Sequence, residues 1–294
     1  MIRKTTGEQI FGVFNAVLMI VICLFTLYPF INTLALSFND GMDANRGGIY
    51  LWPRVWTLRN YENTFKDATI INGYMVTIIR TVLGTITTLF CTGLLGYGLS
   101  KKYLLGRKLY LSLCIFCMIF NAGLIPTYML YRDIRLLNNF LVYILPSAVN
   151  IWYMILMKTF FEQIPIDLEE SAMLDGASAL MIFFKIIIPI SMPIIATISI
   201  FSAVAQWNAW FDAFIFMSRR LDLHPVQTYL YRVVTLSQMQ AQTPGDVLLL
   251  ERARLNVITI RATTVMVTTI PIVFIYAIFQ KHFIKGVMIG ALKG

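Results

Sequence analysis

The sequence predicts an all-α integral membrane protein with six transmembrane helices. Of its 294 residues 58% are hydrophobic and 13% are charged, and the mean hydropathy is +0.71, a composition typical of membrane proteins. Several apolar runs reach the length of about 20 residues that a helix needs to cross a bilayer. Because lipid offers the backbone no hydrogen-bond partners, helices are favoured over open strands in such runs.

The predicted spans are long runs that carry almost no charge. The first follows Arg3 and Lys4 and lacks the small-residue cleavage site of a signal peptide, so we expect an uncleaved span. The second is interrupted only by Arg80. The predicted spans are 10–37, 69–99, 109–131, 137–158, 187–216 and 259–280. Local kinks or helix starts are predicted at Pro126, Pro146, Pro189, Pro193 and Pro271.

The orientation follows from the short segment Lys101–Lys108, "KKYLLGRK", which has four bases and no acid. Lys and Arg in short loops mark the cytoplasmic side of a membrane protein. With an even number of spans, both termini then lie in the cytoplasm. The loop 162–186 is also predicted to be cytoplasmic, and the long loop 217–258 extracytoplasmic.

The cytoplasmic loop 162–186 is unusually acidic. It has five carboxylates and no base between Glu162 and Asp175. Asp167 and Glu170 have the spacing of a capping box, which predicts a helix that starts at Asp167, and Gly176 can end it in a left-handed conformation. A second helical piece with an apolar side is then expected from Ala177, Leu180, Met181 and Phe184.

Two interpretations of this loop remain open on the residues alone. It could be an amphipathic segment that lies on the membrane surface without a partner. Acidic groups are, however, repelled by the anionic inner leaflet, and a basic protein partner explains the charge better.

A motif in the same loop resembles one known family. The stretch "E170-S-A-M-L-D-G176", nine further residues and then "I186-I-I-P189" resembles the EAA motif of ABC importer permeases, which is Glu-Ala-Ala, three residues, Gly, nine residues and Ile-x-Leu-Pro. Ser171 and Ile188 depart from it conservatively. Near the two ends, "YPFINTLALSF" (28–38) and "QKHFIKGVMIGALKG" (280–294) look like those of sugar-importing permeases of the MalG type, so the resemblance covers essentially the whole chain.

The resemblance implies a single permease domain over 1–294 with the MetI-like fold of type I importers, in a bacterial cytoplasmic membrane. The implied partners are a second homologous permease subunit, two ATPase subunits and an extracytoplasmic solute-binding protein, and the cargo is a saccharide. The residues implied to couple this chain to the ATPase are Asp167, Glu169, Glu170, Ser171, Ala172, Asp175, Gly176, Ile186 and Pro189.

The resemblance also implies that the C-terminal tail reaches toward the ATPase interface. The residues concerned are Lys285, Gly286, Gly290, Lys293 and Gly294. A frayed terminus without a partner is the alternative.

The chain is not expected to be an enzyme or to hold a cofactor. It has no G-x-x-x-x-G-K-[ST] phosphate loop, so ATP and Mg²⁺ are expected on the partner ATPase. The Cys114-x-x-Cys117 spacing lies inside an apolar run without a second pair of ligands, and His224 and His282 are isolated in the sequence. No metal site and no catalytic residue is therefore predicted.

A candidate substrate path lies toward the outer end of the fifth span, in "QWNAWFDAFIF". Trp207 and Trp210 could stack on sugar rings while Asn208 and Asp212 bond hydroxyls, although interfacial tryptophans often only anchor a helix. The glycines of "GLLGYG" (93–98) are expected to form a close-packing helix surface. Bases in the outer loops could face an acidic binding protein or a uronate oligomer, or form a solvated basic surface.

A secondary transporter or channel that works without an ATPase is the alternative function. Such a protein needs charged residues buried within its spans to bind ions or protons. Only Arg80 and Asp212 come close in the sequence, and the sequence gives no reason to pair them.

Overall fold

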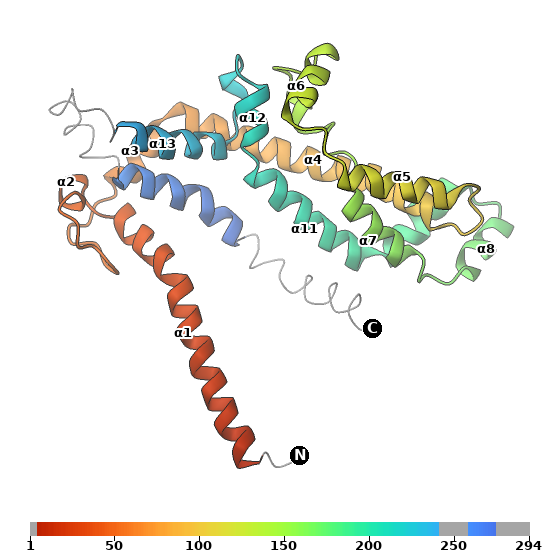
Figure 1. Ribbon diagram of the computed structural model, residues 1–294, viewed down its shortest axis with the longest axis horizontal. Helices are drawn as coiled ribbons and strands as arrows, with labels where there is room; N and C mark the ends of the chain where they lie inside the picture. The colour runs from red at the N-terminus through yellow and green to blue at the C-terminus, as the bar shows by residue number, and fades with distance from the viewer. Residues whose placement is uncertain (1–4, 241–257, 275–294) are drawn as a thin grey trace. The chain divides into compact units, whose positions relative to one another are not determined.

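The computed structural model describes residues 5–240 and 258–274, and the regular secondary structure in these ranges is helical (Figure 1). The chain divides into two compact units, one of Met1–Ala68 with Leu230–Ile270 and one of Thr69–Tyr229 with Pro271–Gly294. The all-α prediction is thus confirmed for the described residues. The predicted C-terminal residues Lys285, Gly286, Gly290, Lys293 and Gly294 lie outside them.

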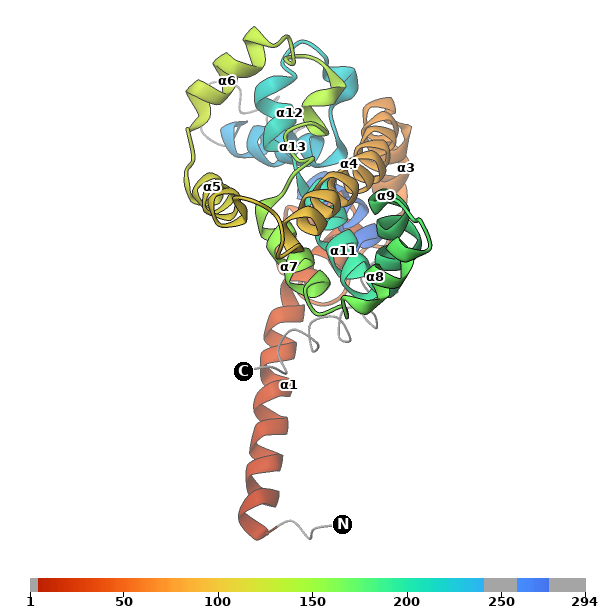
Figure 2. The same cartoon turned by 90° about the vertical axis from the view of Figure 1, so that its right-hand side faces the viewer.

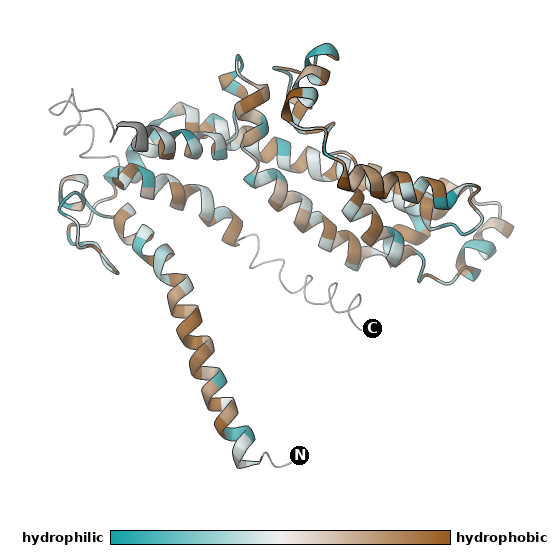
Figure 3. Ribbon diagram, viewed as in Figure 1, coloured by the Kyte–Doolittle hydropathy of each residue, from teal (hydrophilic) through white to brown (hydrophobic). Residues whose placement is uncertain are grey.

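The first unit contains α1 (Thr6–Ser37), α2 (Gly41–Ala44), α3 (Arg59–Lys66), most of α13 (Val226–Gln240) and most of a helix over Ile258–Phe274. Thr5 and Glu8 form a capping box at the start of α1, which satisfies two of the free amides there. Most apolar side chains of α1 are exposed rather than buried in protein, although Ala35 is buried, and Figure 3 shows the middle of the helix as mostly hydrophobic, with hydrophilic residues nearer its ends. Such a surface suits contact with lipid.

The loop after α1 is closed by amide and carboxylate side chains. Asn39 accepts hydrogen bonds from the backbone amides of Arg54 and Val55 and donates one to Asp43. The bond from Asn39, with help from the guanidinium of Arg54, holds the pKa of Asp43 below its ordinary value. Asn60 of α3 donates to the carbonyls of Ser37 and Asn39. These bonds fix α2 and α3 against the end of α1.

The second unit is built on α4 (Ala68–Ser100), the second helix long and apolar enough to span a membrane. Its further helices are α5 (Arg107–Ile119), α6 (Leu124–Asp133), η1 (Phe140–Tyr143), α7 (Ile151–Phe161), α8 (Asp167–Leu174), α9 (Ala179–Ile182), η2 (Phe183–Ile187), α10 (Ile188–Ile190), α11 (Met192–Asn208), α12 (Phe211–Phe216) and η3 (Leu221–Leu223).

Small residues let α4 approach its neighbours, as predicted for the glycine-rich stretch 93–98. A Cβ atom on Gly96 would lie 3.3 Å from the carbonyl oxygen of Met154 in α7, and one on Gly93 would lie 3.2 Å from the Met157 side chain. Gly98 has nothing within 4 Å. Gly93 and Gly96 thus form the close-packing face, and Gly98 lies outside it.

Three of the apolar runs are not one continuous helix. Over 109–131 the chain is broken, because α5 and α6 meet at a bend of 111°. Gly123 has a φ of +87° there, and Asn121 accepts a hydrogen bond from its amide, a local turn that competes with a continuous helix. Pro126 lies in the first turn of α6.

The runs 137–158 and 187–216 are broken as well. The former consists of η1, turns that include Pro146, and α7, whose N-cap is Asn150. In the latter, the helical stretch Ala179–Ile190 meets α11 at a bend of 85°, and Pro189 and Pro193 stand at the starts of α10 and α11. Prolines and a capping asparagine favour helix starts over helix interiors. The helix starts predicted at Pro126, Pro189 and Pro193 are thus confirmed.

With the bent pairs counted as single spans, the described residues contain up to four helical spans, and Ile151–Phe161 and Ile258–Phe274 are shorter apolar helices. The count of six spans stays a prediction.

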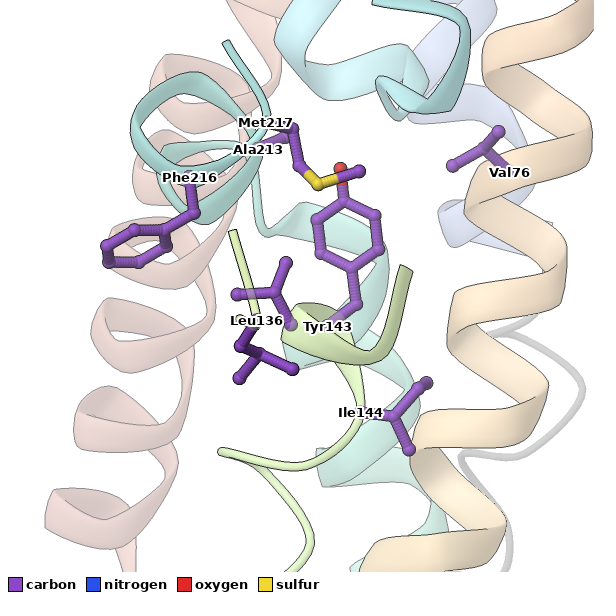
Figure 4. Close-up of a cluster of buried hydrophobic side chains, with 8 residues drawn as sticks. Val76, Leu136, Tyr143, Ile144, Ala213, Phe216 and Met217 are labelled. Carbon is purple, nitrogen blue, oxygen red and sulfur yellow. The ribbon is translucent and has the colours of Figure 1, made fainter. Parts of the chain in front are cut away.

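The second unit has two apolar cores. One gathers Val76, Leu136, Val142, Tyr143, Ile144, Ala213, Phe216 and Met217. Figure 4 shows the ring of Tyr143 among these side chains, with Met217 at its hydroxyl end. The other core holds Met157, Phe161, Ile182, Phe183 and Ile187 between α7, α9 and η2, and it supports the acidic loop.

Candidate functional site

The acidic loop folds into a short helix, α8, that starts at Asp167 as predicted but without the predicted capping box. The N-cap is Ile166, with helical φ and ψ and no side-chain cap, and Asp167 is the first helical residue. The amides of Leu168 and Glu169 already bond to the carbonyls of Pro165 and Ile166. The predicted capping box between Asp167 and Glu170 is therefore wrong, because Pro165 sets helical geometry before Asp167 is reached. The acidic first turn still suits the helix dipole.

The end of α8 follows the prediction. Gly176 has a φ of +83°, its amide bonds to the carbonyl of Met173, and the amide of Ala177 bonds to that of Ala172. This is the Schellman arrangement, which needs a left-handed residue where glycine stands. Ser178 then caps α9 through a bond from the amide of Met181. Two helical pieces joined at a glycine are thus confirmed.

One carboxylate of α8, Glu169, points into the protein. Its side chain is buried and pairs with the ammonium group of Lys101, just after the end of α4. Lys101 also lies 4.0 Å over the ring of Tyr97, whose hydroxyl is 3.4 Å from Glu169 Oε2. A buried carboxylate is stable only with such partners. Glu169 therefore fastens α8 to the end of α4, and Figure 2 shows α8 and α9 together at that end of the unit.

A second carboxylate, Glu162, is also neutralised within the chain. It pairs with Arg107 at the start of α5 and with Lys158 of α7. The bases that the loop itself lacks thus come from the ends of α4, α5 and α7. Sequence spacing gave no sign of these partners, because the pairs to Arg107 and Lys101 join positions 55 and 68 residues apart.

The other three carboxylates of the loop, Asp167, Glu170 and Asp175, are exposed. Within the described part of the chain none of them forms an ion pair. Leu174 is 90% exposed between them. The result is a surface of three carboxylates and an apolar side chain on α8, which we call the acidic face, and Figure 3 shows hydrophilic residues on this helix.

Of the remaining predicted coupling residues, some are exposed and others pack on the apolar core under the loop. Ser171 is exposed next to Glu170, whereas Ala172 is buried against the core that contains Ile182 and Phe183. Ile186 packs partly on the same core, and Pro189 is exposed in α10. The predicted apolar side of the second piece is exposed at Leu180, Met181 and Phe184; the buried residues are its neighbours Ile182, Phe183 and Ile187.

The candidate substrate-path residues do not form one surface. Trp207 is 7% exposed, with its ring near that of Tyr74, whereas Asn208 is exposed and Trp210 is partly buried. Asp212 lies at the start of α12, after the break that ends α11. Trp207 lines an apolar cavity that is separate from the surface on which Asn208 is exposed.

Arg80 and Asp212 form an ion pair that the sequence did not reveal. Arg80 is 1% exposed, and its Nη2 and Nη1 lie 2.6 and 3.2 Å from the two oxygens of Asp212. Gln206 Oε1 accepts from Nε and Nη2, the carbonyl of Ala209 accepts from Nη1, and the guanidinium stands 4.3 Å over the ring of Tyr143. The expectation that neither charge has a convincing partner is wrong, because the partners lie 132 residues apart and only the fold brings them together.

A cavity of about 250 Å³ borders this pair. Its wall includes polar side chains from α4, α6, η1, the turn before α7, α7, α11 and α12, all in the second unit. The polar residues are Arg80, Thr88, Tyr131, Tyr143, Ser147, Asn150, Tyr153, Ser202, Gln206 and Asp212. Among the described residues no cluster of His, Cys, Asp and Glu could hold a metal ion.

Comparison with known proteins shows close relatives over the full length. No protein-family model matches the chain. Protein LplC of Bacillus subtilis (strain 168) is 36% identical over 292 residues, 99% of this chain and 98% of LplC. The polygalacturonan/rhamnogalacturonan transport system permease protein YtcP of the same organism is 35% identical over 284 residues, 94% of this chain and 96% of YtcP.

A solved structure has the same fold. One chain in the crystal structure of a bacterial ABC transporter involved in the import of the acidic polysaccharide alginate matches with a TM-score of 0.85 and 31% identity, over 96% of this chain and 100% of that chain.

Proposed function

Because the chain belongs to the family of ABC transporter permeases for sugars, we propose that it is one pore-forming subunit of an importer that carries oligosaccharides or polysaccharide fragments across the bacterial cytoplasmic membrane. A second permease subunit completes the pore, two ATPase subunits supply the energy and hold ATP and Mg²⁺, and a solute-binding protein delivers the cargo. The chain itself catalyses no reaction. The buried Arg80–Asp212 pair is a feature that a secondary transporter could also have, but the relatives that carry this proposal are named as parts of ABC or polysaccharide transport systems.

The division of the carboxylates around α8 carries this proposal. Glu162 and Glu169 are paired inside the chain, whereas Asp167, Glu170 and Asp175 are exposed. A helix fastened on one side and charged on the other is suited to receive a basic protein surface. The acidic face is therefore the proposed docking surface for the ATPase, and Ala172 and Glu169 position it from within.

The contacts that hold α8 in place also offer a route by which movement of the ATPase can be passed to the pore. Glu169 joins α8 to the end of α4 through Lys101, and the core of Ala172, Ile182 and Phe183 joins it to α9 and α7. A displacement of α8 by the ATPase is thereby passed to α4. Two conformations of the pore, each favoured by one nucleotide state of the ATPase, complete the mechanism.

The proposed cargo is a saccharide polymer fragment, and uronate oligomers are candidates. The support is the names of the relatives, one a polygalacturonan/rhamnogalacturonan permease and one a chain of an alginate importer.

Charge reversal on the acidic face tests the docking role. Glu170→Lys is expected to weaken copurification of the ATPase by roughly tenfold or more, because like charges across an interface repel. The matched control is Asp133→Lys, the same charge change at an exposed acid at the end of α6, which is expected to leave copurification unchanged. Equal copurification of both variants with the unaltered chain would refute the docking role of α8.

Glu169→Gln separates docking from coupling in the same preparation. It keeps the acidic face but removes the charge that holds Lys101, so ATPase copurification is expected to persist while sugar uptake per ATP hydrolysed falls. Uptake and hydrolysis are measured together in proteoliposomes. A loss of copurification in this variant would place Glu169 at the interface instead.

A further inference from the structure

We infer that the cavity beside Arg80 and Asp212 is a binding site for an uncharged sugar unit, and that it discriminates against a unit with a free carboxylate. The inference rests on the proposed function, because it takes saccharides as the cargo. The residues concerned belong to the second unit and come from α4, α6, η1, α7, α11, α12 and the turn before α7. The inference runs against the expectation of acidic cargo at this position.

The first step concerns the charged groups in the cavity wall. Arg80 has five N–H groups, and five hydrogen bonds are formed by them: two with Asp212, two with Gln206 and one with the carbonyl of Ala209. Arg80 and Asp212 are the charged residues in this wall. The guanidinium thus has no donor left for a ligand carboxylate, and the wall is neutral as a whole.

The second step concerns Asp212, the more accessible member of the pair. Its side chain is 26% exposed, against 2% for Arg80. Oδ1 accepts from Arg80 and from its own neighbour Ala213, whereas Oδ2 accepts from Arg80. A carboxylate oxygen can accept two hydrogen bonds, which leaves Oδ2 able to accept one from a sugar hydroxyl.

The rest of the wall suits a sugar ring. Tyr131 and Tyr153 present aromatic rings with a polar end, and their neighbours in the wall include Asn150 and Ser202. Hydroxyl and amide groups of this kind exchange hydrogen bonds with ring hydroxyls, while apolar faces cover the C–H groups. A few placed polar groups among apolar ones are typical of small-molecule sites.

A carboxylate in this cavity would be unfavourable. It would enter a partly desolvated space beside Asp212 without a base to pair with, and an unpaired charge is costly to bury. The same sugar with its carboxyl group esterified meets no such cost. The charged groups of an acidic polymer must then lie elsewhere along the path, and this cavity takes an uncharged or esterified unit.

The test uses the assembled transporter in nanodiscs and two matched probes, methyl galactopyranosiduronate as the carboxylate and as its methyl ester. Dissociation constants are measured by saturation-transfer NMR titration. The ester is expected to bind roughly tenfold or more tightly than the carboxylate. Equal or tighter binding of the carboxylate, or no binding of the ester, would overturn the inference.

Variants on α11 locate the site. Ala205→Leu places extra carbon atoms in this cavity and is expected to weaken ester binding by roughly tenfold. Ala203→Leu, two residues away, faces a separate apolar cavity and should leave the dissociation constant within about twofold. Unchanged ester binding in Ala205→Leu refutes this site.

ATPase copurification and ATP-driven uptake are recorded in the same preparations, so that a wrong cavity and a wrong proposed function give different results. A complex that assembles and transports while Ala205→Leu leaves ester binding intact contradicts only the cavity. Failure of the unaltered chain to assemble with an ATPase contradicts the proposed function.

Discussion

The Arg80–Asp212 pair shows at the level of single residues how an apolar chain keeps a charge in its interior. Arg80 is 1% exposed, and the cost of desolvating its guanidinium is offset by two bonds to the Asp212 carboxylate and three bonds to neutral oxygens. Such an arrangement depends on every member, since removal of one partner leaves an uncompensated buried charge.

Asp212→Asn is therefore expected to destabilise the protein by about 3–5 kcal/mol. The measurement is the thermal unfolding midpoint of the purified chain in detergent. The double variant Arg80→Met with Asp212→Asn removes both charges and should lose less stability than Asp212→Asn alone. A single variant as stable as the unaltered chain would show that the pair is not formed in the membrane protein.

This pair also shows a limit of sequence reading. Arg80 and Asp212 were both identifiable as charges within or beside apolar runs, but their contact depends on how α4 approaches the break between α11 and α12. The same holds for Glu169 and Lys101. By contrast, the left-handed Gly176 was predictable, because its role depends on its own backbone and on neighbours within five residues.

Among the helices, α4 organises the second unit through its small residues. Gly96 meets the backbone of α7 at Met154 and Lys158, and Gly84 meets the side chain of Gln206 in α11. A side chain added at Gly96 is expected to be tolerated less well than one at Gly84. The flexible side chain of Gln206 can move away from an added methyl group, whereas the helical backbone of α7 cannot.

Gly96→Val is expected to destabilise the protein by about 1–3 kcal/mol through overpacking against α7. Gly98→Val is the matched control on the same helix, because nothing lies within 4 Å of its Cβ position. Both substitutions change helix propensity equally, so the difference between their unfolding midpoints reports the contact. Equal midpoints would mean that α4 and α7 are not in close contact at Gly96.

At the same scale, hydropathy predicted where the apolar segments lie but not whether each is one helix. Hydropathy indicates which segments can lie in lipid. Because it is averaged over a window, it does not register the single residues at which helices start and end. Gly123, Asn150 and Pro193 were visible in the sequence, and each has a known preference for a turn or a helix start. Such local signals inside an apolar run deserve more weight than the run length alone.

For the whole molecule, the predicted orientation places the acidic face and both termini in the cytoplasm. This orientation is inferred from the bases of Lys101–Lys108, which mark the cytoplasmic side. The contacts of Lys101 with Glu169 and of Arg107 with Glu162 put this segment and the acidic loop at the same end of the second unit. A cytoplasmic Lys101–Lys108 therefore implies a cytoplasmic α8.

Cysteine labelling checks this orientation. In a chain whose four cysteines are replaced by serine, Ser218→Cys, in the predicted outer loop, is expected to react with a membrane-impermeant maleimide in intact spheroplasts. Ser171→Cys should react only after lysis. Both side chains belong to exposed residues. Labelling of Ser171→Cys in intact spheroplasts would reverse the topology and rule out docking of a cytoplasmic ATPase on α8.

The bend between α5 and α6 restricts what can surround this subunit. Residues 120–123 are exposed at a turn of 111°, and a turn lacks the repeating amide-to-carbonyl bonds that let a helix sit among acyl chains. Hydrocarbon cannot solvate such a corner, whereas water or another polypeptide can. Within a bilayer, residues 120–123 therefore cannot contact lipid. They must face a water-filled space or be covered by a neighbouring chain.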